Sequence, residues 1–226
     1  MGTYAVKYVT SSSICADSTT FSVTINPTNT VYVNGAYDIS TATYVQNFSV
    51  GTQESAPTDI TFNNDGTKMY VIGSAGDDVN EYSLSTAFDV STASYVQRFL
   101  VNSQEATPNG ITFNNDGTKM YITGNSGDDV NEYNLTTAFD VSTASYVQRF
   151  VVSSQESDPA GVAFNNDGTK MFVIGYSGDD VNEYSLSTAF DVSTASYVQR
   201  FVVSSQEANP SGIIFNNDGT KMFITG

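Results

Sequence analysis

The 226-residue chain is strongly acidic, with 24 acidic and 8 basic side chains and a formal net charge of -16. Such a charge repels phosphate backbones and anionic lipid headgroups, so we expect no nucleic-acid partner. The chain has no histidine and a single cysteine, which excludes an intrachain disulfide, a thiolate metal cluster and histidine-dependent catalysis. No apolar run approaches the roughly 18 residues of a membrane-spanning helix, so we also expect no membrane insertion.

The first residues differ from the rest of the chain. Residues 4–8 and 21–25 alternate apolar and polar side chains, as in a β-hairpin, and an Asn-Pro pair follows them as a linker. This stretch resembles the last two strands of the Ig-like modules of bacterial surface adhesins, in which a cysteine placed like Cys15 is common. We therefore predict a partial Ig-like hairpin and linker over residues 1–27. The beginning lacks signal-peptide features and the end breaks within a strand, so we expect a segment of a longer protein.

The remainder of the chain is a tandem repeat. The sequence FNNDGTKM recurs with an exact period of 51 residues, beginning at Phe62, Phe113, Phe164 and Phe215. A second marker, FDVSTASYVQRF, begins at Phe88, Phe139 and Phe190, and a diverged copy begins at Tyr37. A period of this length is typical of solenoids and propellers.

Each repeat contains four short segments rich in β-branched and aromatic residues. In the first repeat these segments predict strands at residues 59–62, 68–73, 78–84 and 95–101. Residues 63–66, Asn-Asn-Asp-Gly, predict a tight hairpin turn, and they lack the spacing and distal glutamate of a calcium-binding loop. Four strands in about 50 residues form one propeller blade, so the predicted fold class is an all-β propeller of four-stranded blades.

The repeat boundaries suggest how a ring could close within a propeller spanning residues 28–226. We predict three complete blades at about residues 56–103, 107–154 and 158–205. A fourth, composite blade would combine residues 209–226 with residues 30–50, which would remove the exposed edges of the sheets. A monomer closed in this way, part of a larger propeller, and a homodimer completing an eight-bladed ring all remain open.

The hairpin sequence FNNDGTKMYV resembles that of YVTN-type and lactonase-like propellers of bacterial and phage surface proteins. The resemblance covers roughly residues 30–226 and implies a propeller fold at the cell surface or outside the cell. Enzymes of that family are expected to use catalytic histidines or metal-binding clusters. Because this chain has no histidine, we do not expect the family's enzymatic activity to carry over to it.

Two sets of repeated acids are the candidate binding residues. In a propeller, the connection between blades and the loop between the second and third strands emerge on the same face, so we expect both sets there. The first set is a possible ligand rim: Glu54, Glu105, Glu156 and Glu207. The second set is a candidate calcium site: Asp77, Asp78, Asp128, Asp129, Asp179 and Asp180. A solvated rim without a ligand is the alternative.

The repeated acids do not suggest catalysis. Glycoside hydrolysis needs two carboxylates with different pKa values in one asymmetric pocket, whereas near-identical repeats offer equivalent environments. We find no non-repeated polar cluster, so we expect no enzyme. The predicted function is an extracellular or cell-surface module that binds a protein or carbohydrate ligand in adhesion. A structural spacer without ligand is the alternative, and a lactonase-like hydrolase is the third hypothesis.

Overall fold

The structure, a computed structural model, describes residues 4–6, 21–23 and 44–226, and it divides the chain into two units, Met1–Val45 and Gln46–Gly226. In the first unit, β1 (Tyr4–Val6) pairs antiparallel with β2 (Phe21–Val23), where the sequence predicts a hairpin. Cys15 lies outside the described residues. All further description concerns the second unit.

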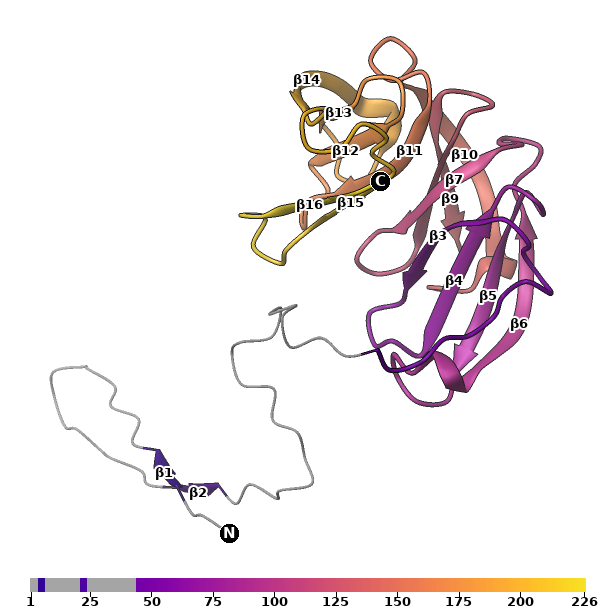
Figure 1. Cartoon of the computed structure of the whole chain (residues 1–226), viewed down its shortest axis with the longest axis vertical. Helices are drawn as coiled ribbons and strands as arrows, with labels where there is room; N and C mark the ends of the chain where they lie inside the picture. Colours follow the sequence, from indigo (N-terminus) through magenta and orange to yellow (C-terminus); the bar gives the residue numbers. More distant parts are fainter. Residues whose placement is uncertain (1–3, 7–20, 24–43) are drawn as a thin grey trace, which may run out of the picture. The chain divides into compact units, whose positions relative to one another are not determined.

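The second unit consists of repeated antiparallel sheets, as predicted, each a simple meander in sequence order (Figure 1). The first blade contains β3 (Pro57–Phe62), β4 (Lys68–Gly73), β5 (Asp78–Leu84) and β6 (Ala93–Leu100). The second contains β7 (Pro108–Phe113), β8 (Lys119–Gly124), β9 (Asp129–Leu135) and β10 (Ala144–Val151). The third contains β11 (Pro159–Phe164), β12 (Lys170–Gly175), β13 (Asp180–Leu186) and β14 (Ala195–Val202).

Two shorter kinds of element complete the unit. Single 3-10 turns precede the outermost strands at η2 (Val90–Thr92), η3 (Val141–Thr143) and η4 (Val192–Thr194). A two-stranded half blade follows the third blade and consists of β15 (Gly212–Phe215) and β16 (Met222–Thr225). These short helical turns are far below the length and hydrophobicity that a membrane-crossing helix requires.

The predicted hairpin turn is confirmed in every repeat. In the first, the Gly66 N–H donates to the Asn63 carbonyl, and Gly66 has φ of 70°, a conformation in which a side chain is strained. The Asp65 carboxylate accepts hydrogen bonds from the Thr67 N–H at 3.0 Å and from the Thr67 hydroxyl at 2.6 Å. These bonds lower the pKa of Asp65, led by the one from the Thr67 hydroxyl. The turn therefore fixes the register of the first two strands.

Apolar packing joins each blade to the next. Tyr70 and Ile72 of the first blade are fully buried in one cluster with Met120 and Tyr133 of the second, and Tyr121 of the second blade is buried likewise with residues of the third. Full burial of a side chain of this size contributes about 1.5–3 kcal/mol. The innermost strands β3, β7, β11 and β15 contact one another in that order. We call these four the inner strands.

The predicted composite blade is not formed by the residues that the structure describes. Residues 30–43 lie outside them, and residues 44–50 contain no strand. Within the described part of the chain, β16 pairs only with β15. Closure of a ring by the two ends of the chain therefore stays a prediction.

Candidate functional site

The glutamates predicted as a ligand rim are buried rather than exposed in the complete blades. Glu54, Glu105 and Glu156 are 1%, 0% and 1% exposed. The Glu54 carboxylate accepts hydrogen bonds from the backbone N–H groups of Ala56 at 2.7 Å and Gly76 at 3.0 Å. Its burial fits a role in joining two loops of its blade, because ionised carboxylates stay buried only when such partners compensate the lost water.

Glu207, the fourth predicted rim residue, lies at the half blade and is less buried than its counterparts. It accepts a single bond in this repeat, from the Asn209 N–H at 3.0 Å. The sequence predicted four exposed carboxylates. In the structure, three of the four are buried and face the backbone of loops instead of solvent.

The second aspartate of each predicted calcium pair is also buried. Asp78, Asp129 and Asp180 are 0% exposed and pair with the guanidinium groups of Arg98, Arg149 and Arg200 at 3.1–3.3 Å. Burial raises the pKa of all three carboxyl groups, and the arginines oppose this shift only in part.

The first aspartate of each pair has a backbone role. Asp77, Asp128 and Asp179 have φ of 46–48°, a left-handed conformation that aspartate tolerates better than most residues. Their carbonyls accept hydrogen bonds from Val101, Val152 and Val203, which closes the loop against the end of the outer strand. In the described part of the chain, no three acidic side chains come together in a way that could hold a metal ion, and the calcium site stays a prediction.

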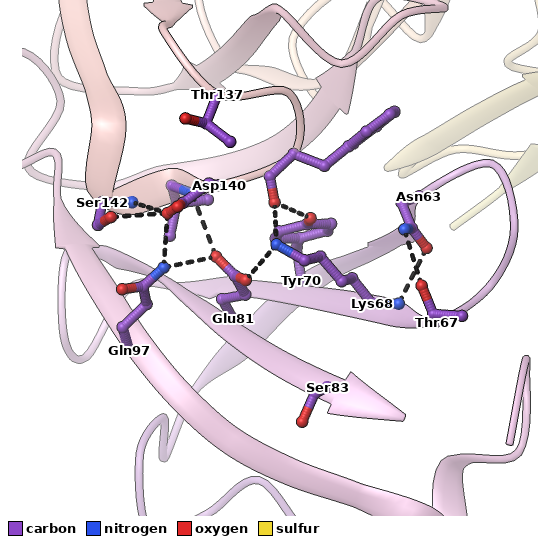
Figure 2. Close-up of polar contacts among 12 residues, drawn as sticks. Asn63, Thr67, Lys68, Tyr70, Glu81, Ser83, Gln97, Thr137, Asp140 and Ser142 are labelled. Atoms are coloured by element: carbon purple, nitrogen blue, oxygen red, sulfur yellow. Dashed lines mark hydrogen bonds and ion pairs between the residues drawn. The ribbon is translucent and has the colours of Figure 1, made fainter. Parts of the chain in front are cut away.

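A polar network joins the first blade to the second (Figure 2). The Lys68 ammonium contacts the Glu81 carboxylate at 2.7 Å and donates to the Phe139 carbonyl at 2.7 Å. The other oxygen of Glu81 accepts from Gln97 at 2.9 Å and from the Val141 N–H at 3.1 Å. Since every charge of this network has a partner inside the protein, it stabilises the interface between the two blades.

A cavity of about 790 Å³ lies among the inner strands, and its volume is in the range of small-molecule sites. Its floor and walls include residues 59–61 of β3, 111–113 of β7, 161–164 of β11 and 212–215 of β15. Asp167 and Asp218 line it from hairpin turns, where the hydroxyls of Thr169 and Thr220 hold them. These two acids recur in every repeat, so they do not distinguish one side of the cavity from another.

Asp59 is different because no other repeat has an acid at its position. The corresponding residues of the later inner strands are Gly110, Gly161 and Gly212. A side chain at Gly110 would meet the Ala160 carbonyl at 2.5 Å, and one at Gly161 would meet the Ser211 carbonyl at 2.9 Å. The close approach of neighbouring inner strands therefore requires glycine at the later junctions, whereas β3 carries a carboxylate there.

Two backbone N–H groups hold the Asp59 carboxylate. One oxygen accepts from Ile60 at 2.7 Å, and the other accepts from Ile111 of the neighbouring inner strand at 2.9 Å. Burial raises the pKa of Asp59, and the two hydrogen bonds oppose the shift without cancelling it. Each carboxylate oxygen can accept a further bond, so Asp59 is fixed in place and still able to bind a hydroxyl or a water molecule.

The next cavity-lining position continues the asymmetry. Two residues after Asp59 and its counterparts, the inner strands carry Thr61, Thr112, Ala163 and Ile214. Side chains two apart on a strand share a face, so one side of the cavity is polar and the other apolar. Sequence reasoning concentrated on repeated acids and missed this site. A position-by-position comparison of the PTDITF, PNGITF, PAGVAF and PSGIIF segments carries the signal.

The fold and the cavity define a protein of the β-propeller class, built from four-stranded blades. No family model matches the chain, and no curated protein does. Solved structures with a similar fold include hydrazine synthase of Kuenenia stuttgartiensis, with a TM-score of 0.53 and 16% identity over 80% of this chain and 45% of that one.

Two further similar structures are named as lactonases. A Bacteroides uniformis protein assigned as a 6-phosphogluconolactonase has a TM-score of 0.53 and 14% identity, over 74% of this chain and 49% of that one. The periplasmic gluconolactonase of Pseudomonas aeruginosa has a TM-score of 0.50 and 14% identity, over 75% of this chain and 42% of that one. At this identity the matches show the shared fold alone, and the chain spans less than half the length of each structure.

These matches correct the expectation that the protein is not an enzyme, because all three similar structures are named as enzymes. The prediction was wrong because it treated the absence of histidine as evidence against any catalysis. Its absence excludes histidine-dependent chemistry, but a buried carboxylate can also act as a base. The adhesion and spacer hypotheses have no support in the matches and stay predictions.

Proposed function

We propose that the cavity among the inner strands binds a small, uncharged sugar lactone and that the protein hydrolyses its ring ester. The observation that carries this proposal is Asp59, an acid held between two inner strands where the other repeats have glycine. Asp59 therefore places a carboxylate on one side of the cavity only, which acids present in every repeat cannot do.

In the proposed reaction, Asp59 acts as a general base. A water molecule beside its carboxylate transfers a proton to it while the water oxygen attacks the carbonyl carbon of the lactone. The ring C–O bond then breaks, and the proton passes from Asp59 to the released alkoxide oxygen. One lactone and one water molecule give one hydroxy acid, and Asp59 returns to its ionised form.

The other side chains of the cavity fit the binding of a sugar-like ring. The hydroxyls of Thr61 and Thr112 can bond to the hydroxyl groups of the ligand on the polar side, while Ala163 and Ile214 offer an apolar surface opposite. The net charge of -16 disfavours a phosphorylated substrate, so we expect a neutral lactone to be preferred.

The names of two similar structures support the lactone as substrate class, since they are given as 6-phosphogluconolactonase and gluconolactonase. The second is periplasmic, which supports the proposal that this protein also acts outside the cytoplasm. Its acidic, cysteine-poor composition is compatible with that location.

The test is lactone hydrolysis measured by acid release, with the spontaneous rate subtracted. We expect the protein to accelerate hydrolysis of gluconolactone more than of 6-phosphogluconolactone. Asp59→Asn should reduce kcat at least tenfold with little change in KM, because it removes the base and keeps the shape of the side chain. Asp65→Asn, in an exposed turn, is the matched control and should hydrolyse at the original rate.

The pH dependence sharpens this test. Asp59 must be ionised to accept a proton, and burial raises its pKa, so the rate should rise with pH around a midpoint above the ordinary value of about 3.9 for aspartate. Hydrolysis no faster than in buffer, or an Asp59→Asn variant with the original rate and pH profile, would contradict the proposal.

A further inference from the structure

The two ends of the blade series are complementary to each other. At each internal interface, the Asn side chain of one hairpin turn donates to the backbone carbonyl of the next turn, 51 residues later. The bonds are Asn64 to Asn115 at 2.6 Å, Asn115 to Asn166 at 2.5 Å, and Asn166 to Asn217 at 2.6 Å. This series of bonds begins at the Asn64 backbone carbonyl, an acceptor, and ends at the Asn217 side-chain amide, a donor. Neither group has a partner within the described residues.

A second series of bonds shows the same complementarity. The ammonium of Lys68 donates to the carbonyl of Phe139 in the following blade at 2.7 Å, and that of Lys119 donates to Phe190 at 2.9 Å. In the same register, Lys221 of the half blade would donate to Phe88 of a first blade. No donor to the Phe88 carbonyl is found in the described part of the chain.

Residues 46–50 already occupy the place of an outer strand beside the first blade. The Gln46 amide donates to Asp89 at 2.5 Å, as Gln97 donates to Asp140 at 2.8 Å across the next interface. The ring of Phe48 packs edge-on against Tyr82 with centroids 5.7 Å apart. The corresponding pair, Phe99 and Tyr133, has centroids 5.6 Å apart in the same T-shaped geometry.

Apolar surface is exposed on both ends. Ile214 and Phe223 of the half blade are 65% and 52% exposed. Tyr121, which occupies the position of Phe223 in the second blade, is fully buried. At the other end, a cavity of about 410 Å³ lies against the first blade and is lined by Phe48, Ile60 and Met69 among others. Each end thus exposes the type of surface that the internal interfaces bury.

We propose that the protein is a homodimer in which each copy supplies the missing partners at the two ends of the other copy's blade series. The half blade of each copy packs against the first blade of the other and joins residues 46–50 of that copy in a shared blade. Two such junctions, related by a two-fold axis, form one closed ring. Residues 30–33, predicted from the sequence as the third strand of this blade, lie outside the described residues.

Two observations favour a second copy over closure within one chain. In the described residues, the half blade forms no hydrogen bond with β3 or with residues 46–50 of its own chain. The similar structures with this fold are also longer, since 74–80% of this chain aligns with only 42–49% of each of them. The matching part of one copy therefore provides less than half of such a chain, and the matching parts of two copies provide most of it.

The experiment is the molar mass of the protein in solution, measured by light scattering. We expect twice the chain mass of 24.2 kDa. Phe223→Asp, on the half blade, and Ile60→Asp, on the first blade, each disrupt both junctions of a homodimer and should give monomers. Val147→Asp places the same charge on an exposed residue of β10 and should stay dimeric, which controls for a general effect of the new acid.

Mixing the two monomeric variants separates the alternatives. The half blade of the Ile60→Asp chain can still join the first blade of the Phe223→Asp chain, so the mixture should recover dimers through one intact junction. Circular dichroism checks that each variant is folded. A monomeric original protein, species larger than a dimer, a dimer that Phe223→Asp leaves intact, or a mixture without recovery would each overturn the proposal.

Discussion

The complete blades and the half blade contain nearly the same hairpin sequence in different surroundings. Gly117 of the second blade lies directly under the ring of Phe139, whereas Gly219 of the half blade has no neighbouring atom within 4 Å of the position of a Cβ. Both glycines have almost the same φ, 72° and 70°. The comparison teaches that local sequence determines the conformation of the turn, while the presence of the third and fourth strands determines whether an aromatic ring packs against it.

The largest expected difference concerns the Lys–Glu ion pairs that lie within a blade at its interface with the next blade. Glu132 is buried and bonds to Lys119, Gln148 and the Val192 N–H of the third blade. Glu132→Gln leaves the Lys119 ammonium without its counter-charge, and we expect a loss of about 3 kcal/mol in the free energy of unfolding.

The matched variant for this test is Glu183→Gln in the third blade. Its partner Lys170 has a side chain 51% exposed, so solvent already screens this pair. We expect a loss of at most about 1 kcal/mol. Both variants are made in the monomeric Phe223→Asp chain, in which no second copy covers the half blade. Urea unfolding of both measures the difference, and equal losses would show that the following blade adds nothing to these pairs.

The next difference concerns the glycines of the turn. Gly117→Ala combines a left-handed alanine with an overlap against the Phe139 ring, and we expect a loss of about 3 kcal/mol. Gly219→Ala has the same backbone strain without the overlap, so about 1 kcal/mol is expected. Thermal unfolding of the two variants, each made in the monomeric Phe223→Asp chain, provides the comparison. A larger loss for Gly219→Ala would contradict this account of the turn.

The smallest expected effect is a pH dependence of stability. The Thr118 hydroxyl and N–H lower the pKa of Asp116, so the folded state binds a proton less readily there than the unfolded chain. This contribution is present above the ordinary pKa and is lost as the pH falls through the lowered value. Asp116→Asn should therefore show a shallower loss of Tm in acid than the original protein. Parallel Tm curves for the two would contradict this assignment.

The sequence predicted the architecture because the repeat period, the strand segments and the turn are local signals. It predicted strands β4 and β5 at the observed residues, and β3 only two residues short of its observed start at Pro57. Local spacing could not predict the burial of Glu54, because its partner Gly76 lies 22 residues further along the chain. The exposed rim of acids was therefore wrong for the complete blades.

The candidate site was missed for a different reason. The acids that the sequence predicts as binding residues recur in every repeat, and a residue present in every blade cannot make one side of a cavity different from another. Asp59 stands out only when the inner strands are known to share a cavity and their positions are compared. In this molecule, the repeated residues build the blades and the divergent inner strands form the candidate site.

The most direct test of this account is Asp59→Gly, which gives the first repeat the residue that the other three contain. It removes two hydrogen bonds from a partly buried carboxylate whose desolvation is itself unfavourable, so we expect a change in unfolding free energy of about 1 kcal/mol or less. The account predicts that this folded variant loses gluconolactone hydrolysis. A variant that hydrolyses gluconolactone at the original rate would contradict the assignment of the site to the inner strands.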